Sequence, residues 1–222
     1  MRKANMEQIT LSGGAQAAAK KETRADSKLQ RGAAKLVRVL TAPPLLALTL
    51  VTALYLCLRE AAFAQPSALF EAVFTLSLLP ALPYLICAVI PSMRRKGRKL
   101  ERSLAIVFSL LGYVMGTLFA ILGGDTRVEL TMYLTYLISG ALLALMTFAF
   151  RFKASGHTCA AAGPFALLTS LLGPAWLAGF LLLIPIFVSS LRLKRHSVGQ
   201  LIAGCAVSVG ALFAAEAIVG LL

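Results

Sequence analysis

Residues 103–122 read SLAIVFSLLGYVMGTLFAIL, twenty consecutive positions without a charged side chain. A helix of this length is about 30 Å long, which matches the hydrocarbon thickness of a bilayer. Six further apolar runs flank it, at about 39–58, 69–91, 130–150, 158–173, 175–190 and 199–222. The runs at 158–173 and 175–190 are short, and form either two spans or a re-entrant pair. The pattern predicts an all-α, polytopic integral membrane bundle with six to seven transmembrane helices.

The composition excludes several other classes of protein. The chain has 222 residues, of which 59% are hydrophobic and 14% are charged. Soluble domains carry about 25% charged residues, and disordered chains are far less apolar. The net charge of +13 is typical of nucleic-acid binders, but here the basic residues stand between apolar runs rather than on a soluble fold. We therefore expect membrane lipids as partners and no nucleic acid.

The chain divides into a polar arm and an apolar body. Residues 1–37 are rich in Ala, Gly, Lys and Arg, and nine basic residues fall between Arg2 and Arg38. No short apolar run follows Arg2 and Lys3, so this segment is not expected to be a secretory signal. We expect a flexible or amphipathic basic arm over 1–37 that attracts anionic headgroups, followed by a membrane-embedded helical domain over 38–222.

The basic residues predict an orientation in the membrane. If all seven runs cross, the loops at 92–102, 151–157 and 191–198 share one face with the arm. That face then holds 20 of the 22 basic residues, and the opposite face holds Arg59 and Arg127. By the positive-inside rule the basic face lies in the cytoplasm, in a membrane of the bacterial cytoplasmic type.

Only two histidines occur, His157 and His196, and the topology brings them together. They are 39 residues apart, which two short crossings joined at Gly173-Pro174 would consume. Both imidazoles then reach the basic face, in loops that also hold Lys153, Arg192, Lys194 and Arg195. Cations of this kind hold phosphoryl oxygens, and histidine attacks phosphorus or protonates a leaving oxygen.

Neither a metal nor another cofactor is expected. No carboxylate lies between Glu129 and Glu216, although magnesium and two-metal sites need oxygen ligands. The four cysteines stand singly in apolar runs, without the spacing of a zinc site or of a disulfide framework. The expected ligand is a phosphate held by protein cations alone.

Two local strings extend this interpretation. Residues 153–158 read KASGHT and residues 189–200 read SSLRLKRHSVGQ. They resemble the second and third signatures of the type-2 phosphatidic acid phosphatase superfamily, usually written PSGH and SRxxxxxHxxxD. The resemblance covers about 94–204, and is closest to a prokaryotic branch with LKRHT followed by Gln and Gly. Leu193 to His196, Gln200 and Gly204 fit that branch, with Ser197 in place of Thr.

The resemblance implies a role for each matching residue. His196 matches the nucleophile that forms a phosphohistidine, and His157 matches the general acid. Ser155 and Gly156 match residues that hold phosphate through a hydroxyl and backbone N–H groups. Arg95 and Arg102 have the spacing of the first signature, KxxxxxxRP, with arginine at both ends.

The chain departs from the signatures at four positions. Ser103 and Ala154 replace prolines, and Ser190 stands at the arginine position of the third signature, so that Arg192 is the nearest substitute. Gln200 stands where an aspartate orients the nucleophile. A glutamine oxygen still accepts a hydrogen bond from imidazole, but it does not stabilise imidazolium as a carboxylate does.

The sequence therefore predicts a phosphatase-like helical domain over 38–222, and a metal-independent membrane lipid phosphatase that acts on a phosphomonoester or pyrophosphate. Phosphatidate, phosphatidylglycerol phosphate and polyprenyl (pyro)phosphates all fit as substrates. The first alternative is a catalytically impaired protein that binds lipid phosphates. The second is a small transporter, for which Glu216 is the one ionisable candidate in mid-span.

Overall fold

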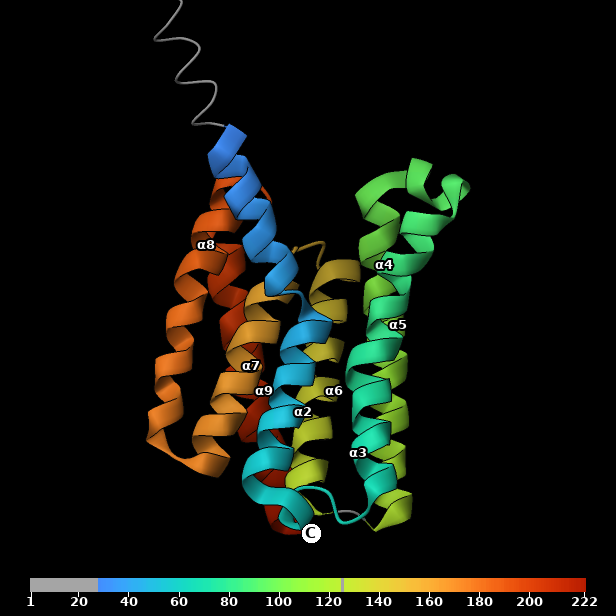
Figure 1. Cartoon of the computed structure of the whole chain (residues 1–222), viewed down its shortest axis with the longest axis vertical. Coiled ribbons are helices and arrows are strands. Elements are labelled where there is room, and N and C mark those ends of the chain that lie inside the picture. Colours follow the sequence, from blue (N-terminus) through green and yellow to red (C-terminus); the bar gives the residue numbers. More distant parts are fainter. Residues whose placement is uncertain (1–27, 125) are drawn as a thin grey trace, which may run out of the picture.

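The computed structural model describes residues 28–124 and 126–222, and this part of the chain is helical throughout, without strands (Figure 1). A helix over residues 28–40, here called the basic helix, comes first. The remaining elements are α2 (Pro43–Leu58), η1 (Arg59–Ala61), α3 (Pro66–Val73), η2 (Phe74–Leu78), α4 (Leu79–Val89), α5 (Pro91–Gly123), α6 (Arg127–Phe148), α7 (Gly156–Leu172), η3 (Pro174–Leu182), α8 (Leu183–Arg192) and α9 (Val198–Leu221).

Prolines set where four of these elements begin. Pro43, Pro66, Pro91 and Pro174 stand at the first turn of α2, α3, α5 and η3. Proline suits this place because its missing N–H belongs to the turn that has no intrahelical partner, and its fixed φ is already helical. Ahead of Pro174, Gly173 has a φ of 104°, which allows the reversal between α7 and η3.

Among the described residues, six helical segments are long and apolar enough to cross a membrane, which confirms the prediction of a multi-pass membrane protein. They cover Pro43–Ala61, Pro66–Val89, Pro91–Gly123, Arg127–Phe148, Pro174–Arg192 and Val198–Leu221. The run predicted at 158–173 corresponds to α7, which has 17 residues and is not one of the six. Large apolar side chains are exposed on the outside of the bundle, among them Leu111, Leu122 and Phe213, as expected of a surface in contact with lipid.

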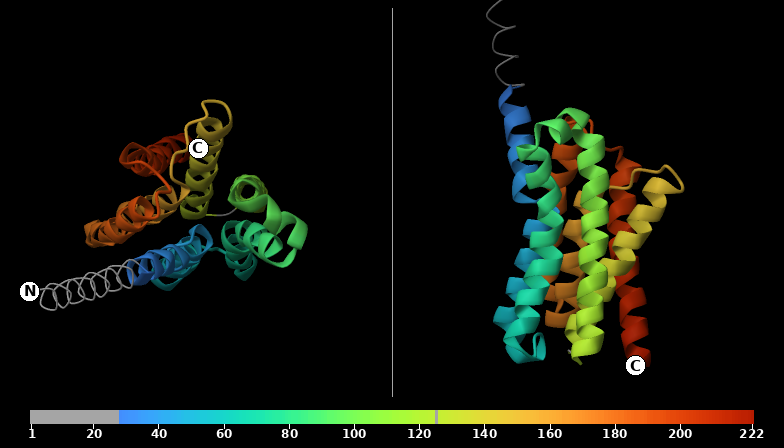
Figure 2. Two further views of the ribbon diagram at one scale, coloured as in Figure 1. Left: turned by 90° about the horizontal axis from the view of Figure 1, so that it is seen from above. Right: turned by 90° about the vertical axis from the view of Figure 1, so that its right-hand side faces the viewer.

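The segments run up and down, so the predicted loops meet at one end of the bundle. Figures 1 and 2 show the basic helix, the start of α5 and the connections 149–155 and 193–197 at this end, here called the basic end. The C-terminus lies at the opposite end (Figure 1). The arrangement agrees with the topology expected if every apolar run passes along the bundle.

Two segments predicted as flexible arm or loop are more ordered than expected. Residues 28–37, assigned to the flexible arm, belong to the basic helix, and the rest of that arm lies outside the described residues. The basic loop at 92–102 is also helical apart from a kink at Gly97, where φ is 70° and ψ is −167°. Runs of Ala, Leu, Lys and Arg have high helix propensity, which outweighs the polar composition on which the prediction rested.

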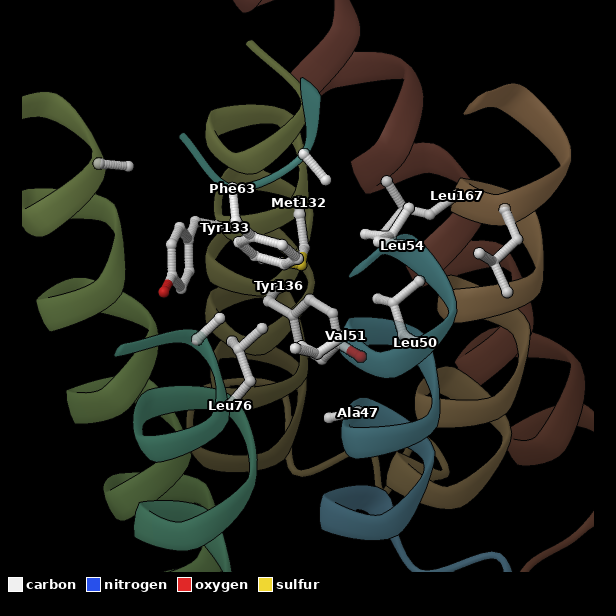
Figure 3. Close-up of a cluster of buried hydrophobic side chains, with 14 of the residues drawn as sticks. Ala47, Leu50, Val51, Leu54, Phe63, Leu76, Met132, Tyr133, Tyr136 and Leu167 are labelled. Atoms are coloured by element: carbon white, nitrogen blue, oxygen red, sulfur yellow. The ribbon is translucent and has the colours of Figure 1, made fainter. Parts of the chain in front are cut away.

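The core lies between α2, α3, η2, α6 and α7. Leu50, Val51 and Leu54 of α2 are fully buried against Met132 and Tyr133 of α6 (Figure 3). Small residues let the neighbouring helices approach closely. A Cβ on Gly112 would meet the backbone of Thr75 in η2, and one on Gly116 would meet the Tyr133 ring. Close backbone approach at small residues is typical of helix packing in membranes.

Candidate functional site

A cavity of about 510 Å³ extends from the basic end into the bundle. Its described lining contains both histidines, His157 and His196, and one carboxylate, Glu101. It also contains seven cationic side chains, which are Arg38, Arg98, Lys99, Arg102, Lys153, Lys194 and Arg195. Deeper in the bundle the wall turns apolar and hydroxyl-bearing, with Ile106, Tyr113 and Ser139. A chamber with this distribution of charge favours an anion with an apolar extension.

The protonation of His196 follows from its neighbours. Its Nδ1 lies 3.2 Å from the backbone oxygen of Lys153 and 3.2 Å from Oε1 of Gln200. Both neighbours are acceptors, so Nδ1 carries the hydrogen and Nε2 carries the lone pair of the neutral ring. The assignment of Oε1 is supported by the backbone N–H of Ser197, which donates to the same atom at 3.2 Å.

The start of α9 holds Gln200 in this position. Ser197 is the N-cap residue, and its hydroxyl accepts a hydrogen bond from the backbone N–H of Gln200 at 3.4 Å. The side chain of Gln200 returns to the backbone of Ser197, which completes a capping box. One oxygen atom of the glutamine thus accepts the free backbone N–H at the start of α9 and also orients the imidazole of His196.

A Schellman motif ends α8 and turns the chain toward the cavity. The backbone N–H of Arg195 donates to the oxygen of Ser190, and that of Lys194 donates to the oxygen of Leu191, each at 2.9 Å. Lys194 occupies the left-handed position of this motif with a φ of 50°. The reversal places Lys194, Arg195 and His196 along the cavity wall.

His157 occupies the first turn of α7 and is bonded at both ring nitrogens to Arg38 of the basic helix. Nη2 of Arg38 lies 3.2 Å from Nδ1, and the backbone oxygen of Arg38 lies 3.3 Å from Nε2. A guanidinium only donates, so Nδ1 accepts and Nε2 carries the hydrogen. His157 is therefore a neutral imidazole in this structure.

Hydrogen bonds between α7 and α9 hold the two histidines in a fixed relation. The backbone N–H of Ser155 donates to the backbone oxygen of Gln200 at 2.9 Å, and the Thr158 hydroxyl donates to that of Leu201 at 2.8 Å. Gly204 permits this contact, because a Cβ there would meet Oγ1 of Thr158 and the backbone oxygen of Ser155. The same glycine was singled out in the sequence by the resemblance alone.

Arg102 braces the loop that leads into α7. Its Nη2 donates to Oγ1 of Thr147 at 3.3 Å and to the backbone oxygen of Ala154 at 3.2 Å. Ala154 is fully buried, so the guanidinium satisfies a carbonyl that water reaches poorly. Arg102 links the end of α6 to the segment that carries Ser155 and His157.

The electrostatics of the site disfavour additional positive charge. Burial and then the charge of Arg38 lower the pKa of His157 to about 3. Burial also lowers the pKa of His196, and nearby Arg102 and Arg38 contribute to this shift. Burial and the neighbouring Arg195 lower the pKa of Arg38 to about 10. A cluster in which cations depress one another's pKa is stabilised by an anion.

The structure places the predicted residues in two groups. His157, His196, Arg102, Lys153, Gly156 and Arg195 line the cavity. Arg95 and Arg192 are exposed and do not line it. Ser155 is fully buried, and its hydroxyl accepts the backbone N–H of Thr158 at 3.3 Å, so it caps α7 instead of facing the cavity. Gln200 does not line the cavity and acts through His196.

Four cations that line the cavity were not among the residues predicted to bind phosphate, namely Arg38, Arg98, Lys99 and Lys194. Arg98 and Lys99 follow the kink at Gly97, and Lys194 is set by the Schellman motif. Arg38 carried a weak signal, because Lys28, Arg31, Lys35 and Arg38 recur at helical spacing on one face of the basic helix.

No protein-family model, no curated protein and no solved structure matches this chain. The arrangement of its own residues therefore carries the functional argument.

Proposed function

We propose that this protein is a membrane lipid phosphatase that removes a terminal phosphate through a phosphohistidine on His196, without a metal ion. The observation that carries the proposal is the state of His196. Its Nδ1 hydrogen is shared by Lys153 and Gln200, which leaves the Nε2 lone pair available in a cavity with seven cations. An oriented, neutral imidazole among cations has the properties of a nucleophile toward a phosphate ester.

The reaction needs one attack, one proton transfer and one hydrolysis. Nε2 of His196 attacks phosphorus as the bond to the lipid oxygen breaks, and cations such as Arg102 and Arg195 hold the phosphoryl oxygens. His157, in its protonated form, gives a proton to the leaving oxygen. Water then attacks the phosphohistidine, so that lipid alcohol and inorganic phosphate are the products.

The position of the cavity supports an amphiphilic substrate. The cavity begins at the basic end of a multi-pass membrane protein and continues inward past apolar lining residues such as Pro43, Pro80 and Ile106. A lipid can therefore place its phosphate among the cations while its chains stay in an apolar environment. Phosphatidate, phosphatidylglycerol phosphate and polyprenyl (pyro)phosphates share this chemistry.

We assign the basic end to the cytoplasmic face. The basic helix and the basic connections lie at this end, and Arg59 and Arg127 begin elements at the other end. Short loops rich in Lys and Arg usually remain on the cytoplasmic side of a membrane, and this rule supports the orientation. The substrate would then approach from the inner leaflet.

A second candidate function is binding of lipid phosphates without turnover. It is favoured by the contact between Arg38 and His157, which keeps His157 neutral, and by a glutamine at the position that orients His196. A protein of this kind would retain the cation-lined cavity and form no covalent intermediate.

A lipid phosphate panel tests the proposal directly. Purified full-length protein in detergent is assayed for phosphate release from phosphatidate, phosphatidylglycerol phosphate and polyprenyl pyrophosphate, with and without EDTA. We expect release from at least one substrate at a rate that EDTA does not change. His196→Ala should abolish release, and His157→Ala should lower it by about 10²- to 10⁴-fold.

Two controls separate the candidate functions. Lys96→Ala removes an exposed cation outside the cavity and should release phosphate like the wild type. Quenching with denaturant at alkaline pH, in which phosphohistidine is stable, after addition of substrate ³²P-labelled in its terminal phosphate should trap a phosphoprotein in the wild type and none in His196→Ala. Substrate binding without trapped phosphoprotein or phosphate release contradicts the phosphatase and supports the binding protein. Full activity of His196→Ala contradicts the mechanism.

A further inference from the structure

Arg38 is the one residue of the basic helix that lines the cavity. The stripe of Lys28, Arg31, Lys35 and Arg38 runs along one face of this helix, and its last member reaches the histidines. Nη1 of Arg38 donates to Oγ of Ser190 in α8 at 3.0 Å, while Nη2 donates to His157 at 3.2 Å. The guanidinium thus lies between α7 and α8, although it comes from a helix that precedes all the predicted spans.

The guanidinium is held by neutral acceptors only. Within residues 28–124 and 126–222, its side-chain hydrogen bonds go to a serine hydroxyl and an imidazole. After burial, Arg195 has the largest effect on its pKa and lowers it, Tyr84 raises it, and Arg98 lowers it further. A half-buried guanidinium prefers an oxyanion, because its parallel N–H groups match two oxygens of a carboxylate or phosphate.

The contact with Arg38 also prevents His157 from acting as an acid. Nδ1 must accept the Arg38 N–H, so it cannot carry a hydrogen of its own. Nε2 carries the single hydrogen of the ring and donates it to the Arg38 backbone oxygen. The remaining N–H of a neutral imidazole is too weak an acid to protonate a leaving group. His157 therefore becomes an acid only after Arg38 leaves Nδ1 and this nitrogen takes up a proton.

We propose that Arg38 is a phosphoryl ligand supplied by the basic helix, and that its transfer from His157 to the bound phosphoryl group converts His157 into a proton donor. The anion is a stronger acceptor than imidazole and competes for the same N–H groups. Once Nδ1 is free it takes a proton from solvent, and the imidazolium loses that proton to the leaving oxygen as the phosphorus–oxygen bond breaks. This inference rests on the proposed phosphatase for its last step, but the binding step stands without it.

The contact with Ser190 offers a rescue experiment. Because Oγ of Ser190 touches the Arg38 guanidinium, a longer side chain at position 190 would bring its own guanidinium to the same place. Ser190→Arg in an Arg38→Ala background should therefore restore anion binding. Restoration by a residue from a different helix would show that the charge at this point matters, and not the packing of the basic helix.

Binding is measured on full-length protein in detergent with inorganic phosphate and orthovanadate as probes, so that no turnover is needed. We expect Arg38→Ala to weaken binding by about tenfold to a hundredfold, and Arg38→Lys by less, since lysine keeps the charge but loses the two-pronged geometry. Lys35→Ala, one turn earlier on the same stripe and outside the cavity, should bind like the wild type. Arg38→Gln, which keeps a donor for Ser190, serves if Arg38→Ala does not fold.

Histidine NMR tests the conversion of His157 separately. In His196→Ala the chain keeps one histidine, so ¹⁵N-histidine labelling reports on His157 alone. Saturating phosphate should move the titration midpoint of His157 upward and change the hydrogen-bonded nitrogen. In the Arg38→Ala, His196→Ala variant the midpoint should already be raised, and phosphate should change it little.

The outcomes distinguish this inference from the proposed function. Arg38-dependent phosphate binding in a protein that releases no phosphate from any lipid supports the ligand role and rejects the phosphatase. Phosphate release that is unchanged in Arg38→Ala, together with unchanged vanadate binding, rejects the ligand role and leaves the phosphatase intact. A His157 titration that does not respond to saturating phosphate rejects the conversion.

Discussion

Oε1 of Gln200 lies 3.2 Å from Nδ1 of His196 and accepts, at the same time, the backbone N–H of Ser197 at 3.2 Å. A neutral amide thus orients the imidazole of His196. The amide fixes the tautomer of His196 without adding a negative charge beside it. The pKa of His196 therefore stays below the ordinary value, since burial and nearby Arg102 lower it.

Gln200→Glu should move the acid limb of the pH–rate profile to higher pH. The glutamate keeps the acceptor for Nδ1 and the capping position, but its charge stabilises the imidazolium and raises the pKa of His196. Attack needs the unprotonated ring, so kcat/KM should start to fall at a higher pH than in the wild type. The measurement is kcat/KM for lipid phosphate from pH 4.5 to 8.

Gln200→Leu is the matched comparison, because it removes the acceptor without adding charge. Lys153 still accepts from Nδ1, so we expect a loss of about fivefold to tenfold, the value of one ordinary hydrogen bond. The acid limb should stay near its wild-type position. Equal pH profiles for the glutamate variant and the wild type would contradict the assigned contact.

His157 should make the fold less stable as the pH falls. Its folded pKa of about 3 lies below the ordinary value of about 6.5, so the unfolded chain binds more protons between these two values. The contribution of His157 to the free energy of unfolding is therefore fully present above about pH 6.5 and decreases as the pH falls toward 3. Thermal unfolding in detergent should show this decrease, and His157→Gln should make the dependence shallower.

Saturating orthovanadate supplies a control for the same experiment. Anion binding at the cation-lined cavity stabilises the folded state by mass action, and a negative charge raises the folded pKa of His157. The pH dependence of wild-type unfolding should then approach that of His157→Gln. An equally steep dependence in wild type and variant would assign the effect to other groups.

The sequence predicted the meeting of His157 and His196 because that meeting depends on length and turns. Two passes of known rise, separated by Gly173-Pro174, bring the chain back to its starting end whatever the packing. The same reasoning could not choose among the cations. Arg95 and Arg98 are three residues apart, and the kink at Gly97 decides that only Arg98 lines the cavity.

Arg38 shows the other limit of sequence reasoning. It belongs to a run of basic residues whose composition suggested an arm, and nothing local distinguishes it from Lys35. Its contacts with His157 and Ser190 join residues that are 119 and 152 positions apart in the chain. Such contacts follow from how the basic helix packs on α7 and α8, which periodicity does not encode. In the same way, the sequence motif does not reveal that the Ser155 hydroxyl caps α7.

The assigned orientation can be tested with an impermeant maleimide on intact cells. Lys96 is exposed at the basic end, so Lys96→Cys should be labelled only after the membrane is permeabilised. The adjacent Gly97 is left unchanged, since it has a backbone conformation that side chains adopt at a cost. The parent chain reports the background, because Cys57 is exposed at the other end. Labelling of Lys96→Cys in intact cells above that background would reverse the orientation.

Gly204→Ala should damage the site through the contact between α7 and α9. A Cβ at this position would meet the Thr158 side chain and the backbone oxygen of Ser155, and backbone cannot move aside as a flexible side chain does. We expect a destabilisation of about 1–3 kcal/mol, larger than the gain of about 1 kcal/mol in helix propensity from replacing glycine. Gly199→Ala is the matched control in the same helix, because nothing lies within 4 Å of its added Cβ. Its thermal stability should equal or exceed that of the wild type.

Gly204 also keeps Ser155 next to Gln200, so Gly204→Ala should affect activity as well as stability. Well below the unfolding temperature, phosphate release by Gly204→Ala should fall further than the loss of stability alone explains. Equal activity of the two variants would show that the spacing of α7 and α9 does not set the geometry of the histidines.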